Sequence, residues 1–200
     1  AKYTASMINS RFFFCRSACT KLGSGLYSDL TCSDEADPLK SRHYWNPGQR
    51  AMPAFTWTCK TFDQLNRDEL YEILRLRSAV FVVEQQCVYQ DVDNFDQAAH
   101  HAMGLIGGEI TCYARLLAPD TKYRTASIGR VVANRAKRRR GFGKELMSFA
   151  IQQCEDLWPG RGITISAQQY LEGFYQQLGF VTASSPYLED EIAHIKMVRT

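Results

Sequence analysis

A basic loop with two glycines carries the clearest chemical signal in the chain. Six cationic residues gather there with no acidic residue among them: Arg135, Lys137, Arg138, Arg139, Arg140 and Lys144. Gly141 and Gly143 lack a Cβ, so a ligand can approach the backbone closely at both positions. Positive charge beside free backbone N–H groups is typical of an anion site, and a polyphosphate fits such a loop best.

The elements on either side of the loop would position it. A half-buried strand that opens at residue 127 is predicted by the β-branched Ile128, Val131 and Val132. The helix that follows is predicted by apolar residues at helical spacing, namely Phe142, Leu146, Met147, Ala150, Ile151 and Cys154. Because this helix begins inside the loop, its free N–H groups and the positive end of its dipole point into the anion site.

Periodicity and chain breakers predict an α/β domain of the α+β type, with the element order β, α, β, β, β, α, β, α, β, β. Besides the central strand and the long helix, strands are expected at 55–58, on either side of the Gly107–Gly108 turn, at 163–167, at 180–183 and at 193–198, and helices from residue 66 and at 170–178. A Gly-Gly turn between two strand patterns is a strong hairpin signal.

Composition places the chain among ordinary globular proteins. It has 200 residues, 45% apolar and 22% charged, with a net charge of +3. Seven cysteines, an odd number with no Cys-x-x-Cys pair, favour reduced and mostly buried thiols and a cytoplasmic location. Residues 1–51 show no sustained periodicity and are interpreted as a disordered or non-native extension before a domain over residues 52–200.

Several short motifs resemble those of one enzyme superfamily. The sequence Arg138-x-x-Gly141-x-Gly143 resembles the pyrophosphate-binding signature of the GNAT N-acetyltransferases, and the segment 174–180 (FYQQLGF) resembles a segment near their C-terminus. The segments 76–85 (LRSAVFVVEQ), 89–93 (YQDVD) and 194–197 (HIKM) are similar to the ElaA-type branch. The resemblance covers residues 52 to 199, and Arg139-Arg140 depart from it where many relatives carry one smaller residue.

The resemblance implies the GNAT acyl-CoA N-acyltransferase fold, with a mixed, mostly antiparallel central sheet flanked by helices. It also implies acetyl-CoA as the donor. The backbone of Val131, Val132 and Ala133 would pair with pantetheine like an added strand. The pyrophosphate would be held by the loop residues Arg138, Arg139, Arg140, Gly141, Phe142, Gly143 and Lys144.

Three side chains are candidates for proton transfer. Tyr175 is the candidate general acid, because a phenol stays protonated at neutral pH and can donate to a departing thiolate. Glu84 is a candidate base if burial raises its pKa, and His194 is another. His101 could also relay a proton, although for either histidine alone a structural role is the commoner outcome.

Three aspartates between residues 91 and 96 suggest a calcium loop, but the pattern fails. Phe95 stands at the third ligand position, Asp96 stands where the glycine belongs, and no glutamate lies twelve along. A solvated loop that lines the acceptor site is expected instead, and no metal is needed.

The expected function is transfer of an acetyl group to a primary amine by direct attack in a ternary complex. Three alternatives stay open: a nucleic-acid-binding module that uses residues 137–144, an enzyme like the acyl-homoserine-lactone synthases, and a non-catalytic acyl-CoA sensor. The amine acceptor is open between a small molecule and a protein amine. A monomer or a homodimer is expected, without a nucleic-acid or membrane partner.

Overall fold

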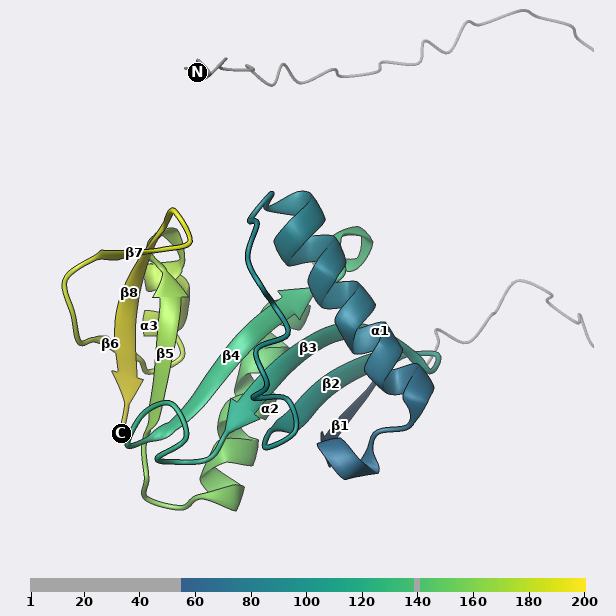
Figure 1. Ribbon diagram of the computed structural model, residues 1–200. Coiled ribbons are helices and arrows are strands. Elements are labelled where there is room, and N and C mark those ends of the chain that lie inside the picture. The colour runs from purple at the N-terminus through teal and green to yellow at the C-terminus, as the bar shows by residue number, and fades with distance from the viewer. Residues whose placement is uncertain (1–54, 139–140) are drawn as a thin grey trace, which may run out of the picture. The chain divides into compact units, whose positions relative to one another are not determined.

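A sheet of eight strands runs through the part of the chain that the computed structural model describes, residues 55–138 and 141–200 (Figure 1). The predicted extension over residues 1–51, the boundary at residue 52, and Arg139 and Arg140 lie outside the described residues. The strands are β1 (Phe55–Thr61), β2 (His100–Ile106), β3 (Glu109–Leu117), β4 (Ala126–Ala133), β5 (Ile163–Gln168), β6 (Val181–Thr182), β7 (Tyr187–Glu189) and β8 (Ile192–Arg199). Their spatial order is β1-β2-β3-β4-β5-β8-β6, with β7 also paired to β8.

The helices are α1 (Arg67–Arg77), α2 (Phe142–Leu157) and the short α3 (Glu172–Gln176). A π-helical segment (Ser78–Glu84) continues α1, and single 3-10 turns occupy Phe62–Gln64, Arg135–Lys137 and Gln169–Leu171. The Asn66 side chain caps α1 by accepting a hydrogen bond from the Glu69 amide, while the Glu69 carboxylate accepts one from the Asn66 amide. None of the described helices is long and apolar enough to cross a membrane.

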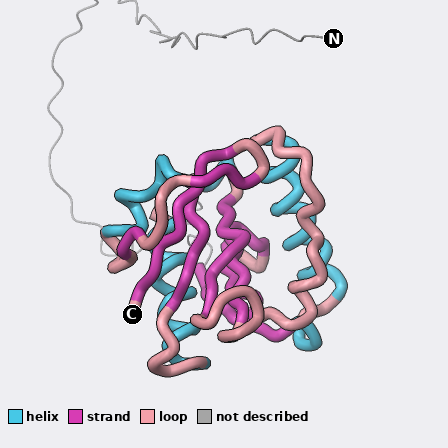
Figure 2. The backbone as a smooth tube through the Cα atoms, turned by 60° about the vertical axis from the view of Figure 1, so that its left-hand side comes forward, coloured by secondary structure: helices cyan, strands magenta, loops and turns pink. Residues whose placement is uncertain are grey.

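The helices cover both faces of the sheet (Figure 2). Strands that are covered on both faces are apolar on both sides. Neighbouring residues of β2 show the division, since Ala102 packs in the cluster that contains the apolar face of α2 and Met103 in the cluster that contains Ile73 of α1. All strand pairs are antiparallel except β4 with β5. The mixed, mostly antiparallel sheet predicted from the resemblance is therefore confirmed.

Strands β4 and β5 pair over only two residues and then diverge (Figure 1). The pairs are Ala126 with Ile163 and Ser127 with Thr164, at the start of both strands. On its other edge β4 stays paired with β3, as far as Ala133 opposite Cys112. The edge of β4 that faces β5 is therefore without a strand partner from residue 128 onwards among the described residues.

A bulge lies in β4 where the strands begin to diverge. Gly129 is opposite Arg115 and Val132 is opposite Tyr113, so two residues of β4 face one residue of β3. Arg130 adopts a φ of 51°, a left-handed conformation that is costly for a residue with a side chain. Something in the fold must hold this residue in place.

The predicted order of elements is confirmed up to the last helix, but three strands follow it in place of the two expected, because the short β7 was not predicted. The π-helical segment 78–84 was not anticipated, because its apolar residues fit helix and strand patterns equally well. The helix expected at 170–178 is shorter, because a 3-10 turn precedes it, and β6 covers two residues of the strand expected at 180–183. Of the cysteines in the described ranges, four are free thiols, and Cys112 and Cys154 among them are buried.

Candidate functional site

A cavity of about 170 Å³ opens where β4 and β5 diverge. Its walls include residues 127–131 of β4 and Ile165, Ser166 and Gln168 of β5. The segment after α1 contributes Phe81, Gln85 and Cys87, and a sulfur–carbonyl contact of 3.8 Å between Cys87 and Asp190 joins this segment to the β7–β8 turn. The cavity therefore lies between segments that are far apart in the sequence.

Tyr175 lies on the wall of this cavity. Its side chain is 7% exposed, and its ring packs edge-on against Phe174 and Phe180. Burial, with a smaller contribution from Tyr170, raises the pKa of Tyr175 to about 12. Its hydroxyl is therefore protonated throughout the neutral range and can donate a hydrogen bond or a proton.

His194 lies on the same cavity, on β8. Its Nδ1 is 2.8 Å from the carbonyl oxygen of Ile192, and because a carbonyl only accepts, Nδ1 carries the proton. The neutral ring then keeps a lone pair on Nε2, as a base requires. The ring stacks on Tyr187, with centroids 6.4 Å apart, which fixes its orientation.

Glu84 is not on the cavity wall and is exposed. Its two carboxylate oxygens accept hydrogen bonds of 2.5 and 2.9 Å from the guanidinium of Arg138. This contact lowers the pKa of Glu84, so the expectation that burial would raise it is wrong. The structure brings Tyr175 and His194 together at the cavity. It leaves Glu84 beside Arg138 of the basic loop with two glycines, which we call the anion loop.

The anion loop begins where β4 ends. Arg138 donates through Nε to the carbonyl oxygen of Ala133, 3.0 Å away, which ties the loop to the strand. Gly141 precedes α2 with a φ of 85°, so glycine is needed there for the backbone. A Cβ on Gly143 would meet no atom within 4 Å, so the first turn of α2 is open to a ligand at that position.

The partnerless edge of β4 leads from the cavity to this loop. Val132 is buried against the α1 side of the sheet, whereas Val131 and Ala133 are half-buried and pack against the cluster on the other face. The backbone groups that point towards β5 have no strand partner among the described residues. Strand edge, glycine loop and helix start thus form one continuous track, and it fits an extended ligand that ends in phosphates.

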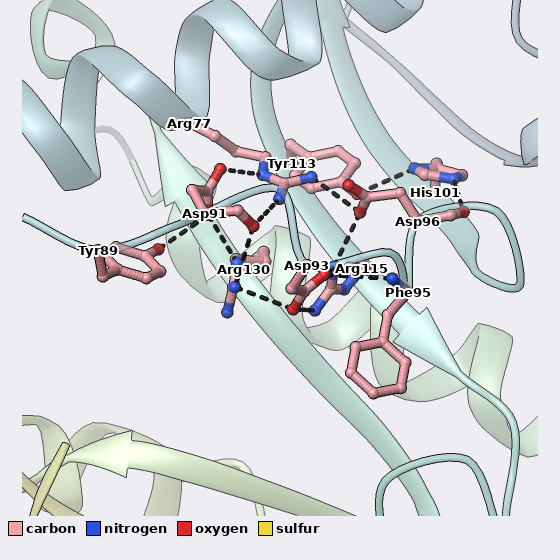
Figure 3. Close-up of polar contacts among 10 residues, drawn as sticks. All are labelled: Arg77, Tyr89, Asp91, Asp93, Phe95, Asp96, His101, Tyr113, Arg115 and Arg130. Atoms are coloured by element: carbon pink, nitrogen blue, oxygen red, sulfur yellow. Dashed lines mark hydrogen bonds and ion pairs between the residues drawn. The ribbon is translucent and has the colours of Figure 1, made fainter. Parts of the chain in front are cut away.

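A buried ion network is the feature of the site that the sequence reasoning missed (Figure 3). Two aspartates of the Asp91–Asp96 loop do not stand in solvent: Asp91 is 9% exposed and Asp96 is 4% exposed. The expectation of a solvated loop is therefore wrong for these two aspartates. Three arginines from three different elements neutralise the loop: Arg77 from α1, Arg115 from β3 and Arg130 from β4.

The contacts of the network are close, and the one between Arg115 and Asp93 is bidentate. Arg77 is fully buried and donates to Asp91 at 2.8 Å and to Asp96 at 2.9 Å. Arg115 donates to both oxygens of Asp93, at 2.6 and 2.8 Å, and to Asp96 at 2.9 Å. Such charge-assisted pairs are the strongest hydrogen bonds available to side chains.

The network holds the bulge of β4 in place. The Nε atom of Arg130 lies 2.7 Å from Asp91, and its Nη2 donates to Asp93 at 3.0 Å. The Tyr89 ring lies 5.3 Å from the same guanidinium. Because Arg115, Arg130 and Tyr89 also line the cavity, the network forms one wall of it and fixes the residue at which the two strands separate.

The pKa of Asp93 sets the pH range in which this residue stabilises the fold. Burial opposes ionisation of Asp93, but hydrogen bonds and charges from Arg115 and Arg130 outweigh it and lower the pKa of Asp93 to about 2. Because this pKa is lower in the folded chain, ionised Asp93 stabilises the fold at any pH above its ordinary pKa of 3.8. This stabilisation is lost as the pH falls towards 2.

His101 belongs to the network rather than to the cavity. It is fully buried, with Nδ1 2.9 Å from the Tyr113 hydroxyl and Nε2 3.0 Å from the Asp96 carbonyl oxygen. Burial lowers its pKa, which keeps the ring neutral. Within residues 55–138 and 141–200, no three histidine, cysteine or acidic side chains converge into a group that could hold a metal ion.

Comparison with known proteins agrees with this arrangement. Residues 64–200 match the family described as "Acetyltransferase (GNAT) domain". Protein ElaA of Escherichia coli is 39% identical over 145 residues, which are 72% of this chain and 95% of ElaA. Its crystal structure has a TM-score of 0.70 and covers 74% of this chain and 100% of that one.

Two further solved structures mark the range of the similarity. The crystal structure of an acyl-CoA N-acyltransferase from Pseudomonas aeruginosa is 44% identical, with a TM-score of 0.71, and covers 74% of this chain and all of that chain. The CoA-dependent acyl-homoserine lactone synthase BjaI is 17% identical, with a TM-score of 0.61 over 72% of this chain and 82% of its own, so it shares the fold alone. Taken with the diverging strands and the glycine loop, these similarities show that the chain belongs to the GNAT acetyltransferase family and catalyses acyl-CoA-dependent acyl transfer.

Proposed function

We propose that the protein transfers an acetyl group from acetyl-CoA to a primary amine by direct attack, with donor and acceptor bound together. The observation that carries the proposal is the cavity between β4 and β5, which has Tyr175 and His194 on its wall and opens beside the partnerless edge of β4. Two proton-transfer groups at a place where a thioester can lie are what aminolysis requires.

The donor would lie along β4 and end in the loop. Backbone groups of Val131, Val132 and Ala133 would pair with pantetheine, and the pyrophosphate would lie against the N–H groups at the start of α2. The charges around it would come from residues 138–140 and Lys144, with Phe142 anchoring the loop by stacking on Phe55 at 4.9 Å.

The two proton-transfer roles would fall to Tyr175 and His194. His194, with Nε2 able to accept, would take the proton from the acceptor ammonium before attack, or from its nitrogen as the C–N bond forms, and Tyr175 would donate to the departing sulfur. Glu84 suits the role of base less well, because its low pKa makes it a weak proton acceptor at neutral pH. It would instead hold Arg138 in place before the donor binds.

The proposal is tested by measuring thiol release from acetyl-CoA across a panel of primary amines, with mass spectrometry of the products. Amine-dependent release with a matching acetylated product is expected. Acetyl-CoA binding without turnover on any amine would indicate a sensor, and tight salt-dependent binding of duplex DNA without acetyl-CoA binding would indicate a nucleic-acid module.

Replacing Arg138 by alanine is expected to weaken acetyl-CoA binding by about ten- to a hundredfold, because charge-assisted hydrogen bonds of about 1.5–3 kcal/mol are lost. Gly143→Val is expected to weaken binding as well, because its side chain would fill the open space at the start of α2. Titration calorimetry measures both. Gly141→Val is a poorer test, because a β-branched residue is strained at a φ of 85°. Unchanged affinity in Arg138→Ala and Gly143→Val would remove the donor assignment.

Replacing Glu84 by glutamine is expected to strengthen acetyl-CoA binding severalfold, because the carboxylate no longer competes with phosphate for the Arg138 guanidinium. The turnover number should stay within about twofold, as expected for a residue that does not transfer the proton. A large fall in turnover with unchanged affinity would instead return Glu84 to the role of general base.

A further inference from the structure

We propose that the acceptor carries an anionic group, a carboxylate or a phosphate, at some distance from its amine, and that Lys122 and Lys196 bind this group. The inference deepens the proposed function, on which it rests, by assigning the chemical class of the acceptor. It starts from a second hollow of about 390 Å³, lined by Lys122, Tyr123, Ser184, Tyr187, Glu189 and Lys196.

The second hollow adjoins the cavity between β4 and β5. Lys122, Tyr123 and Glu189 line both, so a ligand in the first can extend past these side chains into the second. The donor would approach the cavity along β4, whereas Tyr187 and Lys196, which line the second hollow and not the first, belong to β7 and β8. The second hollow is therefore the natural place for the part of the acceptor that does not react.

Two lysines gather around one aromatic ring in this hollow. The Nζ atoms of Lys122 and Lys196 lie 5.7 and 5.3 Å from the centre of the Tyr123 ring, although they come from the segment before β4 and from β8. Within the described residues, neither ammonium group lies within 4.0 Å of a carboxylate oxygen. Two cations beside one ring, neither of them in an ion pair with a carboxylate, favour an anion near them.

The other groups that line the hollow include one carboxylate, Glu189, so the two lysines leave it with a net positive charge. Burial, with Tyr187 and Glu189 nearby, raises the pKa of Tyr123, so its phenol stays neutral. The carboxylate of Glu189 accepts a hydrogen bond from the Ser166 hydroxyl at 2.6 Å, on the side of the first cavity. Glu189 therefore stands at the junction, where it can attract the ammonium form of an acceptor amine, while the lysines beyond it attract the anion.

This distribution of charge selects among amines. An ω-amino acid or an amino phosphate would have its amine near Glu189 and His194 and its anion between Lys122 and Lys196. A polyamine would bring a second cation against the two lysines and be disfavoured. The charge pattern thus separates acceptors that reactivity alone would treat alike.

The test uses the full chain and a series of ω-amino acids of increasing length, each paired with the alkylamine that lacks its carboxylate, and an amino phosphate paired with its amino alcohol. Thiol release from acetyl-CoA gives kcat/KM for each member. The wild type is expected to prefer the anionic member of a pair by about tenfold or more. In Lys122→Met and Lys196→Met this preference should fall by about tenfold, through a higher KM for the anionic member. The KM of the alkylamine or amino alcohol, which lacks the anionic group, should not change. Whether the ω-amino acids or the amino phosphate have the higher kcat/KM shows which anionic group, carboxylate or phosphate, the acceptor carries.

Two controls separate charge from packing. Lys196→Arg keeps the charge and should keep most of the preference. Lys60 lies on the edge strand β1 and pairs with Glu69 of α1, so Lys60→Met should leave the preference for the anionic member unchanged. Equal use of both members of each pair, or a preference that survives both methionine variants, would overturn the inference.

A binding measurement keeps the inference testable even if no amine is acetylated. Calorimetry with the same ω-amino acids and amino phosphate, titrated into protein saturated with CoA, needs no turnover and keeps the anion loop occupied. Binding that is lost in Lys196→Met supports the anion subsite, even if the proposed transfer to amines is wrong. Absence of binding in the wild type together with absence of turnover would overturn it.

Discussion

Replacement of Arg77 by methionine is expected to lower the free energy of unfolding by about 3–5 kcal/mol, the cost of removing one partner from a buried ion pair. Arg77 is fully buried and donates to Asp91 and Asp96, whose buried charges would each keep one arginine in place of two, Arg130 and Arg115 respectively. The midpoint of thermal unfolding should fall by roughly 6–20 °C for a domain of this size. Denaturant titration followed by circular dichroism measures the loss.

The neighbouring Arg75 provides a matched control. It is exposed and pairs with Glu72 on the same helix, so Arg75→Met should lower the free energy of unfolding far less than Arg77→Met. Equal losses in the two variants would mean that the effect comes from the helix and not from the network. A stable Arg77→Met variant would show that the buried aspartates find other partners or take up protons.

Replacement of Tyr175 by phenylalanine is expected to lower turnover on a proven acceptor by about a hundredfold, the lower end for an acid–base group. The change keeps the ring against Phe174 and Phe180 and deletes only the hydroxyl, so stability should change by less than about 1 kcal/mol. Acetyl-CoA affinity should stay constant, because the hydroxyl is needed only as the thiolate departs. Steady-state kinetics and calorimetry separate these quantities.

Tyr170 is the control for this variant. It is 75% exposed and its hydroxyl donates to Gln168, so Tyr170→Phe should leave turnover unchanged. Because the pKa of Tyr175 is raised to about 12, it should produce no alkaline limb in the rate profile at ordinary assay pH. Wild-type turnover in Tyr175→Phe would make the residue structural and leave protonation of the sulfur to water.

What could be predicted from the sequence is what neighbours along the chain decide. The start of α1 depends on Asn66 and Glu69, three residues apart, and the start of α2 depends on Gly141 beside an apolar helical pattern. Such signals act within one or two turns of chain, so periodicity and capping rules detect them. The glycine loop and its helix could be anticipated for the same reason.

What could not be predicted depends on meetings between distant segments. Arg77 and Asp96 each look like ordinary surface charges in the sequence, and only the packing of α1 on the sheet buries them together. Lys122 and Lys196 come together in the same way. The position of Glu84 was also out of reach, because its partner Arg138 lies 54 residues away.

The backbone and the side chain of Arg130 place different demands on this position, and together they restrict which residues can replace it in evolution. Its backbone, at a φ of 51°, favours glycine, whereas its guanidinium must reach Asp91 and Asp93 from the same position. Glycine would satisfy the first demand but leave Asp91 with Arg77 alone and Asp93 with Arg115 alone, and lysine would keep the charge without the forked geometry. No single substitution meets both demands, so the position can change only together with the aspartate loop. Lineages that diverge here should change at both places or at neither.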